Sequence, residues 1–79
     1  MISAEVSLYP MEKVNSDEVI KDSLKALTAN GLSLQVGPLS TRVSGPDDAI
    51  WTGLRALFDR AQAHGGEIAM VVTVANSRE

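Results

Sequence analysis

An α+β fold with the element order β-α-β-β-α-β is predicted by three features of this sequence. Apolar and polar residues alternate over residues 2–9, as they do in a strand with one buried face. Two segments, 16–30 and 46–64, carry apolar residues at helical spacing, and two short alternating segments lie between them. A run rich in β-branched residues at 68–75 supplies the fourth strand.

The first strand and the first helix are separated by a short polar segment. Pro10 ends the alternating strand pattern. Asn15 or Ser16 can cap the helix that follows, and the acidic residues Asp17 and Glu18 in its first turn favour the helix dipole. The apolar residues of this helix are Ile20, Leu24 and Leu27. An Asn-Gly step at residues 30 and 31 is a C-terminal stop signal.

A β-hairpin is predicted over 32–37 and 39–44, with the Gly37-Pro38 step as a tight turn. This turn sets a register in which Val36 faces Leu39. Leu34 then faces Thr41, the one polar residue on a face that also carries Leu32, Leu34, Val36, Leu39 and Val43. Because an unpaired buried hydroxyl costs about 1–3 kcal/mol, Thr41 needs a partner, which is backbone, water or a ligand.

The second helix begins at Pro46 and ends before the Gly65-Gly66 step. Its apolar stripe is Ile50, Leu54, Leu57, Phe58 and Ala61. With right-handed crossovers, the whole element order gives a ferredoxin-like sandwich, in which two helices lie on one face of a four-stranded antiparallel sheet with strand order 4-1-3-2. We therefore expect a single small domain over residues 1–79.

The composition excludes several classes of function. The net charge is −3, and the 7 Lys and Arg residues are interspersed with 10 Asp and Glu, so no basic stripe for nucleic acid or an anionic membrane is present. There is no cysteine and one histidine, which excludes a disulfide, a thiolate site and a histidine cluster. The apolar runs are too short to span a bilayer and no signal peptide is expected, so we expect a cytoplasmic protein.

No arrangement of residues indicates catalysis. The sequence lacks a Ser/His/Asp order with a nucleophile elbow, a metal-ligand spacing and a glycine-rich phosphate loop. His64 precedes Gly65-Gly66 at a helix end, where contact with the helix dipole explains it. Binding without chemistry is therefore predicted, rather than an enzyme.

Several residues could serve a ligand held between the sheet and the helices. Thr41 and its neighbour Ser40 could hydrogen-bond the ligand, with Leu34 as an apolar wall facing Thr41. Trp51 could stack on a flat heterocycle. Simpler roles exist for each, because threonine is common in strands and a lone aromatic residue commonly packs in a core. Asn76, at the end of the last strand, suits a turn or a cap.

The face of the sheet away from the helices is predicted to be bare. It is polar in the first three strands and apolar in the fourth, which carries Val71. Such a face invites a second copy, by edge pairing or by face-to-face packing, although a solvated sheet is the alternative. Glu5 lies on this face, where it could pair with Arg42 or bind an aminopyrimidine. We expect self-association.

Four segments of the sequence resemble the YkoF-like thiamine/hydroxymethylpyrimidine-binding family. They are residues 4–10 (AEVSLYP), 36–45 (VGPLSTRVSG), 49–51 (AIW) and 70–76 (MVVTVAN), and they occur in the family's order. The resemblance implies a ferredoxin-like fold that binds thiamine or its hydroxymethylpyrimidine moiety between sheet and helices, with no cofactor and no catalysis. It also implies a homotetramer built as a dimer of dimers.

The resemblance extends to site residues. The pair Ser40 and Thr41 matches the family's Gly-Pro-x-Ser-Thr element, and Trp51 and Asn76 fall at matching positions. Glu5 lies in a matching segment, but alternation places it on the bare face, where it would serve a subunit interface. Two functions follow: a binding protein for the vitamin or its pyrimidine moiety, and a structural or regulatory oligomeric scaffold without that ligand. A small enzyme, or an accessory subunit of one, is a third.

Overall fold

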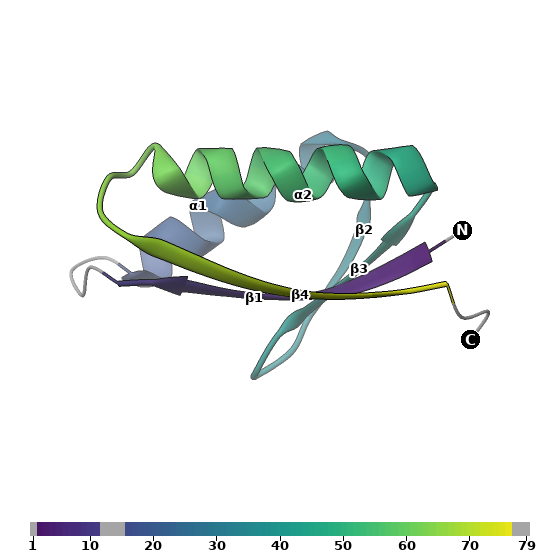
Figure 1. Ribbon diagram of the computed structural model, residues 1–79, viewed down its shortest axis with the longest axis horizontal. Coiled ribbons are helices and arrows are strands. Elements are labelled where there is room, and N and C mark those ends of the chain that lie inside the picture. The colour runs from purple at the N-terminus through teal and green to yellow at the C-terminus, as the bar shows by residue number, and fades with distance from the viewer. Residues whose placement is uncertain (1, 12–15, 77–79) are drawn as a thin grey trace.

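The computed structural model describes residues 2–11 and 16–76 and contains the expected elements in the expected order (Figure 1). They are β1 (Ile2–Pro10), α1 (Ser16–Ala29), β2 (Ser33–Val36), β3 (Thr41–Gly45), α2 (Asp47–Gln62) and β4 (Ile68–Ala75). The strands form one antiparallel sheet in the order β2-β3-β1-β4, and both helices cover the same face of it. The predicted ferredoxin-like fold is therefore confirmed.

The connection between β2 and β3 is longer than predicted. β2 ends at Val36 and β3 begins at Thr41, and the N–H of Gly37 donates to the carbonyl oxygen of Ser40 at 2.9 Å. A two-residue hairpin turn needs a positive φ at its first central residue, and Gly37 does not adopt one. Pro38 lacks an N–H and has a fixed φ, so the chain takes a wider turn.

The wider turn changes the register of the hairpin but not its faces. Val36 lies opposite Thr41 and Leu34 lies opposite Val43, so the predicted pairs of Val36 with Leu39 and of Leu34 with Thr41 are wrong. The shift is an even number of residues, and side chains alternate with a period of two, so each strand residue stays on its predicted side. The predicted burial fails at the tip, where Val36 is 67% exposed and Leu39 is 88% exposed.

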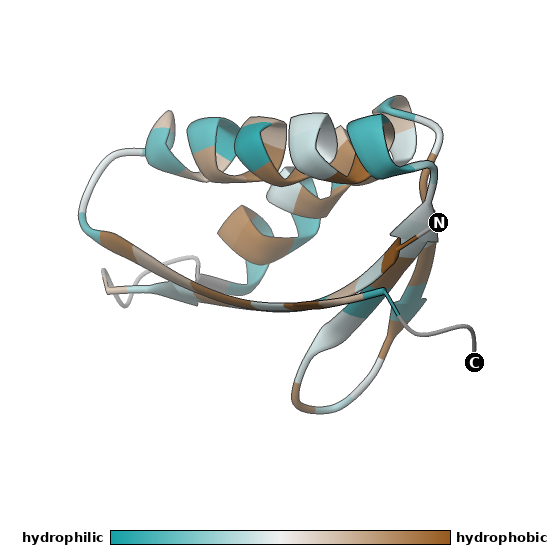
Figure 2. Ribbon diagram, turned by 45° about the vertical axis from the view of Figure 1, so that its right-hand side comes forward, coloured by the Kyte–Doolittle hydropathy of each residue, from teal (hydrophilic) through white to brown (hydrophobic). Residues whose placement is uncertain are grey.

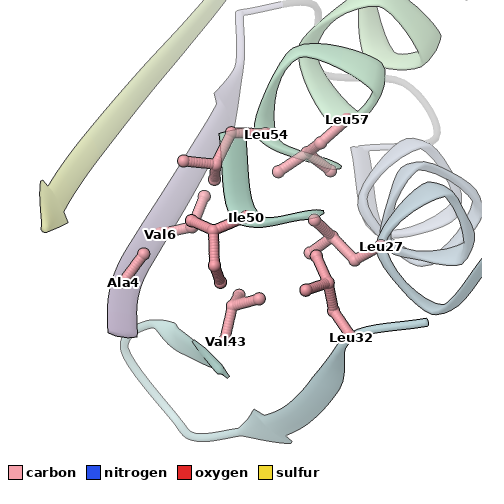
Figure 3. Close-up of a cluster of buried hydrophobic side chains, with 8 residues drawn as sticks. All are labelled: Ala4, Val6, Leu27, Leu32, Val43, Ile50, Leu54 and Leu57. Carbon is pink, nitrogen blue, oxygen red and sulfur yellow. The ribbon is translucent and has the colours of Figure 1, made fainter. Parts of the chain in front are cut away.

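The core lies between the sheet and the helices and consists of aliphatic side chains (Figure 3). Its buried members are Ala4, Val6, Leu27, Leu32, Val43, Ile50, Leu54 and Leu57. In α2 the predicted stripe is buried apart from Phe58, which is half-buried, and Gly53 joins it. Figure 2 shows the hydrophobic side of this helix turned toward the sheet.

In α1 the buried stripe differs from the predicted one. Ile20 and Leu24 are half-buried, whereas Leu27 is fully buried as predicted. The other buried residues of the helix are Val19, Ser23 and Ala26. The helix ends as expected at the Asn-Gly step, where Gly31 has a φ of 76°. Asn15, one of the two predicted caps, lies outside the described residues.

Both helices are short surface helices. Within the described residues, neither α1 nor α2 is long and apolar enough to cross a bilayer.

The start of α2 agrees with the prediction. α2 follows Pro46, whose extended backbone precedes the first turn, and it carries Asp47 and Asp48 in that turn. Figure 1 shows that the hairpin tip extends away from the helices, on the other side of the sheet.

Candidate functional site

Thr41 is the buried polar residue that the alternation predicted. It is the first residue of β3, is 7% exposed, and lies between Val6 of β1 and Val36 of β2 on the helix-facing side. Among the described residues, no side-chain hydrogen bond satisfies its hydroxyl. The hydroxyl of a buried threonine without a side-chain partner is a potential donor and acceptor for a small molecule.

Apolar side chains lie on both sides of Thr41 on the helix-facing side of the sheet. On one side of Thr41, Ala4 and Val43 are buried. On the other side, Leu8 of β1 and its partner Met70 of β4 are half-buried, although both pack against the core. The apolar layer is therefore partly open on the Leu8 side of Thr41, as it also is at Val74, which lies opposite Ala4 and is 37% exposed. A flat ring on the Leu8 side would contact apolar side chains and the hydroxyl of Thr41.

Ser40 and Leu34 lie near Thr41 in the hairpin. Ser40 is half-buried in the turn and lines a hollow of about 340 Å³ on the open face of the sheet. Leu34 is half-buried beside Val43 and packs against the core. The hairpin thus holds three of the five predicted site residues, with Thr41 and Leu34 on the helix-facing side and Ser40 beside the open face. Leu34 is displaced by two residues from the predicted position opposite Thr41.

Trp51 and Asn76 lie at the other end of the sheet. Trp51 is in the second turn of α2 and is 56% exposed, so it is not a core residue. Asn76 follows β4 and is exposed, and the end of β4 lies near Ile2, which pairs with Gly45. Gly45 is four residues from Thr41, about 13 Å along an extended strand. The chain therefore does not bring Trp51 and Asn76 together with Thr41.

A row of polar side chains crosses the open face of the sheet. In strand order it consists of Gln35, Arg42, Glu5 and Thr73, each directly opposite its neighbours. Glu5 and Arg42 occupy the two central strands, yet the ion pairs among the described residues do not include a pair between them. The ion pair with Arg42, one of the two roles considered for Glu5, is therefore not formed within the described part of the chain.

A hollow lies on each side of this row. The first is the hollow beside the hairpin, and the second, of about 360 Å³, is lined by small residues of β1, β3 and β4. Glu5 and Arg42 line both of them. The described open face thus has a central pair of opposite charges with space along the strands in both directions.

A charged cluster joins the two helices on the opposite side of the molecule. Asp22 of α1 accepts hydrogen bonds from Arg60 of α2, and His64 lies 2.8 Å from the same carboxylate. Hydrogen bonds from Arg60 and His64 hold the pKa of the Asp22 carboxyl well below its usual range. The sequence pattern did not reveal this cluster, because partners that are 38 and 42 residues apart depend on how the helices pack.

The sheet order and the paired helices define a small ferredoxin-like α+β protein. Within that class the chain belongs to the YKOF-related Family, whose model matches residues 1–77. Among curated proteins, no sequence matches the chain.

Solved structures share the fold at low sequence identity. A hypothetical protein of Methanocaldococcus jannaschii has a TM-score of 0.87 at 14% identity, covering 99% of this chain and 81% of its own. A Streptococcus pneumoniae protein has a TM-score of 0.89 at 17% identity, with 98% and 87% covered. A Thermotoga maritima protein provisionally named for thiamine biosynthesis or salvage has a TM-score of 0.84 at 17% identity, with 96% and 83% covered. At these identities the likeness concerns the fold.

Proposed function

We propose that this protein binds a small molecule, thiamine or its hydroxymethylpyrimidine moiety, and does not transform it. Membership of the YKOF-related Family over residues 1–77 carries this proposal. The name of the similarly folded Thermotoga maritima protein, which refers to thiamine biosynthesis or salvage, is consistent with it. A protein that holds such a ligand would act in salvage or transport.

We place the ligand on the helix-facing side next to Thr41. The Thr41 side chain is buried, and its hydroxyl lacks a side-chain partner among the described residues. On the same face, half-buried Leu8 lies two residues beyond Val6, the partner of Thr41, and half-buried Met70 lies opposite Leu8 in β4. An aminopyrimidine ring needs apolar side chains against its faces and a hydrogen-bonding group at its edge, and these residues supply both. Leu34, on the same face of the hairpin, would complete the site, and Ser40 would contribute from the turn beside the open-face hollow that it lines. Trp51 and Asn76 would reach the site from a neighbouring copy.

The test is titration calorimetry with thiamine and with hydroxymethylpyrimidine, using Thr41→Val. Valine keeps the shape of threonine and removes the hydroxyl, so we expect affinity to fall by about tenfold, the value of one hydrogen bond. Thr52→Val, at an exposed position of α2, is the matched control and should bind as the unaltered protein does. Saturable binding that Thr41→Val leaves unchanged would place the ligand elsewhere, and no heat from folded protein would refute the proposal.

An oligomeric scaffold without a vitamin ligand is the second candidate. It is favoured by the aliphatic side chains that fill the space between α2 and the centre of the sheet (Figure 3). Both candidates include self-association, and we propose a homotetramer built from two dimers. Native mass spectrometry separates the candidates, because a retained molecule of the ligand's mass supports binding, whereas a ligand-free oligomer that takes up no added thiamine supports the scaffold.

A further inference from the structure

Glu5 and Arg42 are directly opposed on the two central strands, and both face away from the helices without an ion pair between them. We infer that these two residues pair between copies: the open faces of two chains pack together so that Glu5 of each copy binds Arg42 of the other. The inference rests on the self-association proposed above and is independent of the ligand.

The position of the two charges within the sheet suits a two-fold axis. The strand order β2-β3-β1-β4 puts the midline of the sheet between β3 and β1, and therefore between Arg42 and Glu5. Rotation by 180° about an axis along that midline, just above the face, places β1 of one copy over β3 of the other. Glu5 then meets Arg42 of the second copy, and the reciprocal contact forms by symmetry.

The residues around the charges leave room for this contact. Packed sheets are about 10 Å apart, a gap that a glutamate and an arginine span together. The neighbouring row toward the start of β1 has small side chains, namely Ser33, Ser44, Ser3 and Ala75. The two hollows beside Glu5 and Arg42 would accept side chains of the second copy.

An apolar contact fits the same operation. Val71 of β4 lies opposite Ser7, one row from Glu5 in the direction of the hairpin, and is 56% exposed on the open face. The rotation carries Val71 of one copy across the midline, so that it lies over the hollow beside the hairpin of the other copy. That hollow is lined in part by Val36, Pro38 and Leu39. The exposed apolar residues of β4 and of the hairpin tip would thus cover one another.

Charge reversal tests the pairing between copies. Glu5→Arg alone and Arg42→Glu alone each place like charges at both reciprocal contacts, and we expect each to weaken self-association on the order of a hundredfold. An equimolar mixture of the two variants restores opposite charges at both contacts. We expect this mixture to form mixed dimers with an affinity within about tenfold of that of the unaltered protein, and the doubly reversed chain to associate with itself.

Sedimentation equilibrium at low ionic strength gives the affinities, and native mass spectrometry identifies the mixed species. Lys25→Glu, an exposed charge reversal on α1, is the control and should leave association unchanged. The inference is overturned if the mixture associates no more tightly than either variant, or if the unaltered protein is a monomer at high micromolar concentration. Thiamine binding that depends on Thr41 would survive that failure, because Thr41 lies on the other face of the sheet.

Discussion

Arg60 binds the carboxylate of Asp22 through two parallel hydrogen bonds, from Nε to Oδ2 at 3.0 Å and from Nη2 to Oδ1 at 2.9 Å. The contact joins the last turn of α2 to the middle of α1, and His64 Nε2 adds a third contact at 2.8 Å. Two-point pairing fixes the planes of both groups, so it sets the relative position of the helices as well as adding attraction.

Replacing Asp22 with asparagine should lower the melting temperature at pH 7. In the folded protein the pKa of Asp22 is depressed, chiefly by Arg60, so the ion pair stabilises the fold above the ordinary carboxyl pKa of about 4. That contribution is lost as the pH falls below this value. The melting temperatures of Asp22→Asn and the unaltered protein, followed by circular dichroism, should therefore converge toward pH 2. A gap that stays constant with pH would show that the carboxylate charge is not the cause.

The effect of burial on stability is tested by replacing a buried and an exposed leucine with alanine, in the variants Leu57→Ala and Leu39→Ala. Leu57 is fully buried beneath α2, and removing its side chain to the Cβ should lower the free energy of unfolding by about 2–5 kcal/mol. Leu39 protrudes from the hairpin tip, and Leu39→Ala should change the stability of a single chain by less than about 0.5 kcal/mol. Urea denaturation at low protein concentration measures both, and equal losses would mean that the tip is packed.

The hairpin shows what alternation can and cannot predict. Alternation fixed the side of the sheet on which Leu34 and Thr41 lie, since a register error of an even number of residues does not change the side. It could not predict that Leu39 leaves the sheet, because that depends on the backbone angles of Gly37 and Pro38. Burial at the tip also depends on how far the helices reach over the sheet.

In the candidate site, too, the sequence predicts the positions that depend on strand alternation and not those that depend on how the helices pack. The burial of Thr41 follows from its strand position, which the sequence determines. The exposure of Trp51 does not, because a lone aromatic residue one turn into an amphipathic helix can face the core or the solvent. The contact of His64 with Asp22 and the burial of Ser23 both depend on the packing of α1 against α2, for which the sequence carries no local signal.

Gly53 is a helix-interior glycine that we expect to resist replacement by alanine. A Cβ at this position would lie 2.5 Å from Cδ1 of Leu32 and 3.3 Å from Cδ2 of Leu27, and both leucines are buried. Overpacking should therefore outweigh the gain of about 1 kcal/mol in helix propensity and leave Gly53→Ala less stable by about 1–2 kcal/mol. Thr52→Ala, on the exposed side of the same turn, should be neutral or slightly stabilising in the same denaturation experiment.

Ser23 should accept alanine with a gain in stability. Its side chain is fully buried in α1, and its hydroxyl oxygen has no hydrogen-bond partner among the described residues. Ser23→Ala removes an unsatisfied buried group and introduces the residue with the highest helix propensity, so we expect a gain of about 1 kcal/mol. Thermal denaturation checks the sign, and a loss of stability would mean that water or a residue outside the described ranges satisfies the hydroxyl.

Trp51 can report where the ligand binds, because it is the single tryptophan and lies far from Thr41. A ring stacked on its exposed indole would quench its fluorescence, whereas a ligand beside Thr41 of the same chain would leave the emission nearly unchanged. We expect calorimetric saturation by thiamine with little quenching in protein that native mass spectrometry shows to be monomeric. Strong quenching in the monomer would move the site to Trp51 and Asn76. Quenching only in the assembled protein would instead show that a neighbouring copy brings its Trp51 to the site.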